Sequence, residues 1–226
     1  PENAPISYAT IQNKTGWSNY KEWFPERWEE LVKMCDFPVI QIGEKDAYKI
    51  PGAIHDYMGQ DLTTAISLIA NSNLHIGLDS FGNHLTNYQW QSQKELRDIP
   101  AIILWGSSQA TAAGYSRNIN ISSGLNCQPC FKQNPELVKD ITGEPCNNPP
   151  EQNYHSPRHE CMMQISVEQV FAEIQKKWQP GVNIKNSSKP TVCLTMIVKN
   201  ESHIIHEVLT SVYKHINYWV VVDTGS

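Results

Sequence analysis

Two short segments combine charged, hydroxyl and glycine residues in a pattern that suits an anionic ligand. The first, Lys-Glu-Trp-Phe-Pro-Glu-Arg-Trp over residues 21–28, supplies Lys21. The second, over residues 79–85, supplies Asp79, Ser80, Gly82 and His84. Lysine brings a mobile positive charge, hydroxyl and imidazole groups form hydrogen bonds, and glycine lets the backbone approach a ligand closely. These residues predict a site for a phosphate or for sugar hydroxyls.

Each residue also has a simpler interpretation. Lys21 alone could be a solvated loop lysine, Asp79 could cap a helix, and His84 could be structural. Glu44 could accept hydrogen bonds from a ribose or be an ordinary surface glutamate. The functional interpretation therefore depends on whether the loops that carry these residues meet.

The pattern of apolar residues predicts that they do. Short, nearly continuous apolar runs are typical of parallel strands buried on both faces, and they occupy residues 8–11, 37–42, 74–78 and 99–105. Helical periodicity occupies residues 25–34, with Pro25 first, and residues 62–70, with Asp61 as a cap. The alternation predicts an α/β fold: a Rossmann-like parallel sheet with helices on both faces. Lys21, Glu44, Asp79 and the loop 106–108 should then share the edge formed by the carboxyl ends of the strands.

A cysteine-rich segment, residues 124–161, shows no periodicity and is predicted as a long structured loop. It holds Cys127, Cys130, Cys146 and Cys161. The first two form a Cys-x-x-Cys pair, which is half of a typical zinc site. A structural zinc ion, free thiols and disulfides all remain open.

A second alternation of elements follows. We expect a helix capped by Ser166 to run to about Trp178, and residues 179–190 have the composition of a linker. Beyond it, strand, helix and strand are predicted at residues 192–198, 201–215 and 218–222. We therefore expect one domain over residues 1–178 and, over residues 191–226, the truncated βαβ start of another, in a piece of a longer protein.

The order of motifs resembles the C-terminal half of glycosyltransferase family 9, the ADP-heptose:lipopolysaccharide heptosyltransferase type. The resemblance covers about residues 5–178 and rests on segments 21–28, 59–62 (Gly-Gln-Asp-Leu), 79–85, 103–106 (Ile-Leu-Trp-Gly) and 127–130 (Cys-Gln-Pro-Cys). It implies the GT-B architecture, in which two Rossmann-like domains face across a cleft and this half holds the nucleotide-sugar donor. The donor-binding residues carried over are Lys21, at the diphosphate, with Glu44, Gln60, Asp79, Ser80, Gly82 and His84. Phe81 departs from the motif, because the family commonly has glycine there.

The tail is similar to a different family. Residues 194–201 (Leu-Thr-Met-Ile-Val-Lys-Asn-Glu) and 220–226 (Val-Val-Val-Asp-Thr-Gly-Ser) look like the opening of a family 2 glycosyltransferase of GT-A fold. By that resemblance Asp223 would help to recognise the donor base. A complete domain of that kind can use a divalent metal, held by an Asp-x-Asp motif that this sequence does not contain.

Composition narrows the function further. A net charge of −5 argues against a general nucleic-acid binder. No apolar run approaches a membrane span and no export signal is visible. We expect a cytoplasmic glycosyltransferase piece, with room for peripheral association with a membrane-bound acceptor, that binds a nucleotide-diphosphate sugar for transfer to a glycan or lipopolysaccharide-type acceptor.

The resemblance also sets limits on what this piece does. The GT-B site needs no metal, and the carboxylate that activates the acceptor belongs to the other half. This piece alone should therefore bind the donor weakly or not at all and should not turn over. Two alternatives stay open: a non-catalytic nucleotide- or partner-binding module with a structural zinc loop, and a UDP-sugar epimerase of the GT-B fold.

Overall fold

The computed structural model describes residues 4–16, 18–87, 99–131, 159–179, 193–198, 205–212 and 218–223. The chain divides into two compact units. Unit 1 comprises Pro1–Tyr88 and Arg97–Asn183, and unit 2 comprises Gln89–Leu96 and Ile184–Ser226. The predicted linker, residues 179–190, lies almost entirely outside the described residues, so the predicted domain boundary stays a prediction.

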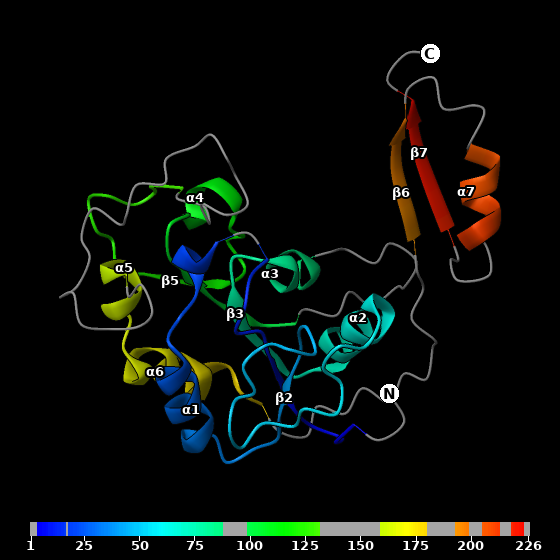
Figure 1. Ribbon diagram of the computed structural model, residues 1–226. Coiled ribbons are helices and arrows are strands. Elements are labelled where there is room, and N and C mark those ends of the chain that lie inside the picture. The colour runs from blue at the N-terminus through cyan, green and yellow to red at the C-terminus, as the bar shows by residue number, and fades with distance from the viewer. Residues whose placement is uncertain are drawn as a thin grey trace. The chain divides into compact units, whose positions relative to one another are not determined.

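Unit 1 is built on a parallel sheet of five strands (Figure 1), in the order β2-β1-β3-β4-β5. The strands are β1 (Ala9–Ile11), β2 (Val39–Gln41), β3 (Leu74–Leu78), β4 (Ala101–Trp105) and β5 (Ile119–Ser122). The first four confirm the predicted apolar runs. The fifth was not predicted, because Asn120 and Ser122 interrupt its apolar residues, which suits a strand at the sheet edge.

Helices cover both faces of this sheet, as predicted. On one face lie α1 (Pro25–Met34), α5 (Glu160–Met163) and α6 (Val167–Lys177), whose side chains share a core with Ile11, Leu78 and Leu104. On the other lie α2 (Leu62–Asn71), α3 (Phe81–Leu85) and α4 (Ala110–Ala113). There Ile40 packs with residues of α2 and α3, and Trp105 packs with α4. The alternation of side chains along each strand therefore supplies a core on each face of the sheet.

The predicted helix starts are confirmed. Pro25 is the first residue of α1. Asp61 accepts a hydrogen bond from the backbone N–H of Thr64 at 2.7 Å, and Ser166 accepts one from Gln169 at 3.2 Å. Within the predicted loop 124–161, the described residues 124–131 contain no helix or strand. However, α5 already begins at Glu160, so the loop prediction was wrong at its end.

Unit 2 contains the predicted strand, helix and strand. The strands β6 (Cys193–Val198) and β7 (Tyr218–Asp223) pair in parallel, with α7 (Ile205–Val212) between them in the chain. Both ends of the predicted helix 201–215 lie outside the described residues.

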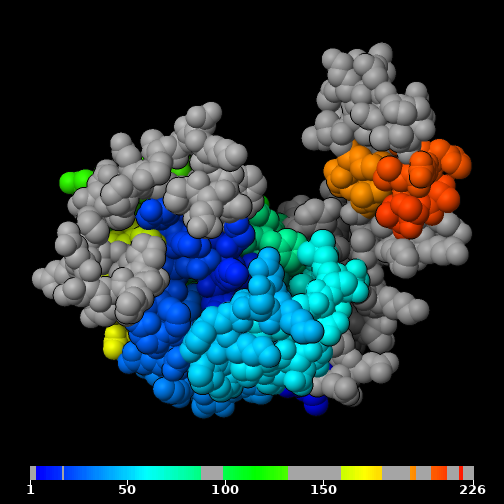
Figure 2. All heavy atoms as spheres, viewed as in Figure 1, coloured from blue at the N-terminus to red at the C-terminus, as the bar shows by residue number. Residues whose placement is uncertain are grey.

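Figure 2 shows unit 1 with its blue and cyan N-terminal half forming one continuous surface.

A buried histidine lies in the middle of the larger sheet. His75 on β3 is fully buried, and its Nδ1 lies 3.0 Å from the hydroxyl of Thr10 on β1. Its Nε2 is closed off by glycines, because a Cβ atom at Gly82 would lie 2.2 Å from Nε2 and one at Gly77 would lie 2.7 Å from it. Gly82 is thus required here by packing against the histidine ring.

We predict that His75 makes stability depend on pH. Burial lowers the pKa of its imidazole from 6.5 to about 4, so the folded chain keeps the ring neutral while the unfolded chain protonates it below pH 6.5. The contribution to the free energy of unfolding is complete above pH 6.5 and is lost towards pH 4. The loss should total about 3 kcal/mol.

Urea unfolding of the wild type and of His75→Asn across this pH range measures the effect. Carboxylates titrate in the same pH range, but they contribute equally to both proteins. The difference between the two slopes of unfolding free energy against pH therefore isolates the contribution of His75. The matched control His84→Gln, at an exposed histidine, should keep the wild-type slope. An unchanged slope in His75→Asn would contradict the prediction.

Candidate functional site

The strand order places a topological switch point between the carboxyl ends of β1 and β3. The chain leaves β1 towards α1 on one face of the sheet and leaves β3 towards α3 on the other. Ligands of open α/β sheets bind at such a switch point, because the loops diverge and leave the strand ends accessible. The two loops are residues 12–24, which contain the 3-10 helix η1 (Asn19–Lys21), and residues 79–80.

Three polar side chains meet at this switch point. The Nζ of Lys21 lies 2.6 Å from Oδ2 of Asp79, and the hydroxyl of Ser108 donates to the same oxygen at 2.6 Å. The side chains of Lys21 and Asp79 are only 21% and 7% exposed, so water screens this ion pair weakly. The structure thus brings together Lys21, Asp79 and, from the loop 106–108 after β4, Ser108, all three from loops expected at this edge of the sheet.

Backbone contacts hold Lys21 in place. Ser18 caps η1 by accepting a hydrogen bond from the N–H of Tyr20 at 3.2 Å. The carbonyl of Tyr20 accepts from the N–H of Ser107 at 3.0 Å. A Cβ atom at Gly106 would lie 2.3 Å from that carbonyl, so only glycine lets η1 approach the end of β4 this closely.

A glutamine that the sequence analysis missed joins the two loops. The amide of Gln12 donates to the hydroxyl of Ser80 at 3.2 Å and accepts from the N–H of Gly82 at 3.3 Å. Phe81, which replaces the glycine of the resembled family, packs against the core below α2 and α3. The only signal for Gln12 was its position as the first polar residue after an apolar strand.

The other predicted donor residues of unit 1 make their contacts elsewhere, on α3 and beside the edge strand β2. The Nδ1 of His84 on α3 lies 3.0 Å from the hydroxyl of Tyr115, beyond α4. Glu44, after the edge strand β2, is 70% exposed and pairs with Lys14 at 3.5 Å. Gln60 is also exposed. It lies near Glu44, because the N–H of the preceding Gly59 donates to the carbonyl of Gly43 at 2.8 Å. Asp223 ends β7 in unit 2 and is not placed relative to unit 1.

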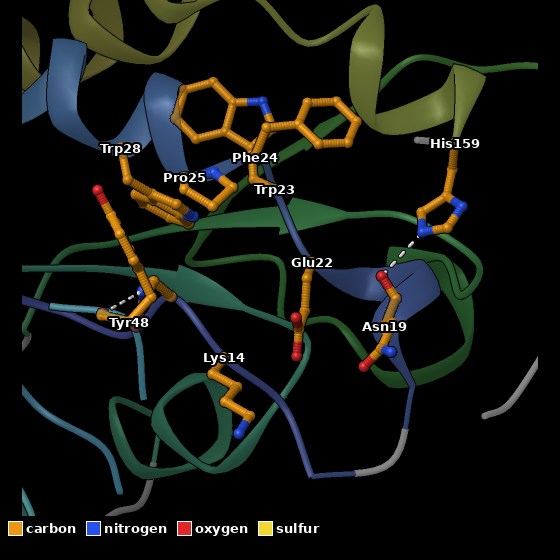
Figure 3. A pocket seen from close by; sticks show the side chains of 10 residues that line it. Lys14, Asn19, Glu22, Trp23, Phe24, Pro25, Trp28, Tyr48 and His159 are labelled. Atoms are coloured by element: carbon orange, nitrogen blue, oxygen red, sulfur yellow. Dashed lines mark hydrogen bonds between the residues drawn. The ribbon is translucent and has the colours of Figure 1, made fainter. Parts of the chain in front are cut away.

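A cavity of about 170 Å³ lies along the same loop (Figure 3). Its lining residues are Asn13, Lys14, Asn19, Glu22, Trp23, Phe24, Pro25, Trp28, Tyr48 and His159. Burial raises the pKa of Glu22, partly offset by the N–H of Thr15, which donates to its carboxylate at 3.1 Å, and by Lys14. Burial also lowers the pKa of His159, whose Nε2 lies 2.9 Å from the carbonyl of Asn19. The cavity thus combines a partly buried carboxylate with aromatic and amide groups.

The cysteine loop is fastened to the end of β4 by Gln128. Its amide nitrogen donates to the carbonyls of Trp105 at 3.1 Å and Gly106 at 2.7 Å. Cys127 and Cys130 on either side are half-buried and Cys161 is buried in the core, all without a disulfide; Cys146 lies outside the described residues. Within the described ranges, no three His, Cys, Asp or Glu side chains gather into a group that could hold a metal ion. The zinc site therefore stays a prediction.

Comparison with known proteins gives structural matches only. No protein-family model matches the chain, and no curated protein does. Among solved structures, it is similar to the iron-containing dodecameric glycosyltransferase TibC of enterotoxigenic E. coli, at 19% identity and a TM-score of 0.54. TibC in complex with ADP-D-β-D-heptose matches at 19% identity and a TM-score of 0.53. Both matches cover 75% of this chain and 44% of TibC.

A glycosyltransferase of family 9 from Veillonella parvula matches more weakly. Its identity is 14% and its TM-score 0.49, covering 77% of this chain and 47% of that one. The chain thus spans less than half the length of the structures it resembles. The TibC matches show the fold: an α/β unit with a parallel five-stranded sheet flanked by helices. In the described part of the chain, no helix has the length and apolar character to cross a membrane.

We predict that Lys21 and Asp79 stabilise unit 1 as a coupled pair. Asp79→Asn leaves the ammonium group of Lys21 without its counter-ion, and Lys21→Met does the same to the carboxylate of Asp79. Each change should lower the free energy of unfolding by about 1–3 kcal/mol. The double variant should lose less than the sum of the two single changes, because the same interaction is lost only once. Urea unfolding of the four proteins measures this cycle.

The pair Glu173–Lys176 on α6 is the matched control. Its ions lie 2.7 Å apart, but its side chains are 26% and 64% exposed. The same cycle with Glu173→Gln and Lys176→Met should give a coupling below about 0.5 kcal/mol. Strictly additive effects at residues 21 and 79 would show that the pair is not coupled.

Proposed function

We propose that unit 1 binds a nucleoside diphosphate sugar and is the donor-binding half of a glycosyltransferase. The observation that carries the proposal is the buried pair of Lys21 and Asp79 at the switch point of the sheet. Support comes from the fold shared with TibC, one structure of which holds ADP-D-β-D-heptose. That this chain binds a nucleotide and a sugar of the same kind is part of the proposal.

Lys21 is suited to stabilise a leaving diphosphate. In the proposed reaction an acceptor hydroxyl attacks the anomeric carbon of the sugar, the carbon–oxygen bond to the diphosphate breaks, and the hydroxyl proton passes to a base. Negative charge grows on the diphosphate as that bond breaks. A fixed positive charge in a partly dry site stabilises it more than water does. We place the base in the other half of the enzyme, so this chain alone should bind donor only weakly and should not transfer sugar.

Asp79 and Ser108 act in this proposal as positioning residues. An ammonium group has three N–H donors, and the bond to Asp79 uses one of them. The others can reach a phosphate while Asp79 keeps the lysine side chain at the strand ends. Ser108, donating to the same oxygen, fixes the carboxylate in turn. A metal ion is not required, because Lys21 and backbone N–H groups supply the positive charge.

The remaining parts of the proposal concern the acceptor and unit 2. The acceptor is a glycan or lipopolysaccharide-type molecule, reached in the cytoplasm, where peripheral association with a membrane would bring the enzyme to it. Unit 2, with its parallel strands β6 and β7, is the opening of a second, GT-A transferase domain. Asp223 at the end of β7 would contact the donor base there, and the complete domain could use a divalent metal.

We predict that Lys21→Met weakens binding of ADP by about tenfold or more, because a charge-assisted hydrogen bond to phosphate is lost. Isothermal titration calorimetry on the 226-residue chain measures this. The control Lys33→Met, at an exposed lysine of α1, changes the net charge equally and should leave the affinity unchanged. Equal affinities in Lys21→Met and the wild type would overturn the donor site.

The second candidate function is a non-catalytic module with a metal loop. The observation that favours it is the Gln128 anchor, which places two cysteines three positions apart on one fixed loop. Zinc is the metal expected for such a pair, whereas TibC is described as iron-containing. A metal-loaded chain that binds neither ADP, UDP nor GDP would favour the module over the transferase.

We predict that the purified chain carries one structural metal ion held by Cys127, Cys130, Cys146 and Cys161. Elemental analysis by mass spectrometry should find zinc or iron in equal ratio to the chain. Cys127→Ser and Cys146→Ser should each lose it, because a site with a missing thiolate binds far more weakly. Cys35→Ser is the control, because Cys35 follows α1 and lies outside the cysteine-rich segment 124–161. Burial and Asp36 raise the pKa of its thiol to about 12, which disfavours the thiolate that binds a metal. A metal-free wild type would exclude the site.

A further inference from the structure

We propose that the cavity beside Glu22 is a subsite for a neutral, hydroxyl-bearing ring of about pyranose size (Figure 3). The inference rests on the proposed function and deepens it, because it assigns a place to the sugar and not only to the diphosphate.

The size of the cavity suits a single ring. Its volume is about 170 Å³. A cavity of about 150 Å³ in another protein accommodates one benzene molecule. One six-membered ring with its hydroxyl groups is a common building block of a glycan that a cavity of this volume can hold.

The carboxylate of Glu22 selects against a phosphate and in favour of hydroxyl groups. One of its oxygens accepts a hydrogen bond from the N–H of Thr15 at 3.1 Å, which leaves further lone pairs on the carboxylate. A negative charge repels an anion but accepts strong hydrogen bonds from hydroxyls. A cationic ligand is disfavoured as well, because Lys14 lines the same cavity.

The rest of the wall presents fixed polar and apolar groups. Asn13 is held by two hydrogen bonds: its carbonyl accepts from Gln41 at 3.0 Å, and its amide donates to the carbonyl of Tyr48 at 3.1 Å. Pro25 and the buried rings of Trp23, Phe24 and Trp28 form the apolar side, to which the C–H groups of a sugar ring are suited. The indole N–H of Trp28 has no acceptor among the described residues, so the wall also holds an unsatisfied donor.

The cavity adjoins the proposed diphosphate site through the chain itself. Glu22 follows Lys21 directly, so their Cα atoms lie about 3.8 Å apart. The side chain of Lys21 extends to Asp79 after β3, whereas that of Glu22 bonds to the N–H of Thr15 after β1. Consecutive residues thus face the anionic and the neutral part of one ligand, or a donor and a neighbouring acceptor sugar.

The test compares ligands with and without the ring on the whole chain. Calorimetry gives the affinities for ADP-heptose and ADP, and saturation-transfer NMR detects free methyl glucoside and methyl mannoside. Glu22→Gln keeps the shape of the side chain and removes its charge. Asn19→Phe, at an exposed position of the cavity lining, fills the space. Glu30→Gln, at an exposed glutamate of α1, is the control and should behave as the wild type.

If the ring comes from the donor, both variants should lower the affinity for ADP-heptose about tenfold and leave that for ADP within about twofold. If it comes from the acceptor, the ADP-heptose affinity should hold, while saturation transfer to the free glycosides seen with the wild type disappears in both variants. Unchanged ADP-heptose affinity together with no glycoside signal from the wild type overturns the subsite, as does an equal loss of ADP and ADP-heptose in Glu22→Gln.

Failure of the donor site itself has a different signature. It would show as Lys21→Met leaving the ADP affinity unchanged, or as a wild type that does not bind ADP. In the latter case the glycoside measurement alone decides whether the cavity takes a sugar ring.

Discussion

The arrangement of the proposed site depends on one ion pair placed where two parallel strands end. Lys21 and Asp79 are far apart in the sequence, and only the adjacency of β1 and β3 brings them within 2.6 Å. Their low exposure makes the attraction strong and makes an unpaired partner costly. Much of the local structure serves to keep this geometry: Gly106 admits η1, Gln12 joins the two loops, and Ser108 shares the carboxylate oxygen.

The fold was predictable for strands that are buried on both faces of the sheet and for helices with a clear start signal. Strands β1 to β4 are short apolar runs, and Asp61, Ser166 and Pro25 mark helix starts through local chemistry that needs no tertiary contact. Strand β5 escaped prediction because it lies at the sheet edge and carries Asn120, whose carbonyl accepts from the indole of Trp105 at 2.9 Å. A polar residue with a distant partner looks the same in the sequence as a residue in a loop.

The site was predictable only in part, for a related reason. Loops that follow parallel strands must share an edge, so Lys21 and Asp79 could be placed together without knowing their contacts. In the sequence, Gly82 was interpreted as a glycine that lets a ligand approach the backbone. In the structure, it is the ring of His75, on the preceding strand β3, that leaves no room for a side chain there. The cavity beside Glu22 could not be predicted, because it joins residues after β1 and β2, at the start of α1 and before α5. Such an assembly follows from packing, which no spacing in the sequence encodes.

Gln128 gives the position between the first two cysteines a chemical identity of its own. Its amide nitrogen donates to two carbonyls at the end of β4, while its oxygen accepts from the N–H of Leu125 at 3.1 Å and the hydroxyl of Ser123 at 2.7 Å. A carboxylate of the same length could not donate, and an ammonium group could not accept. In a Cys-x-Pro-Cys pattern, x stands for any residue. Here that residue is Gln128, which attaches the turn to β4, so few other residues should be tolerated at this position.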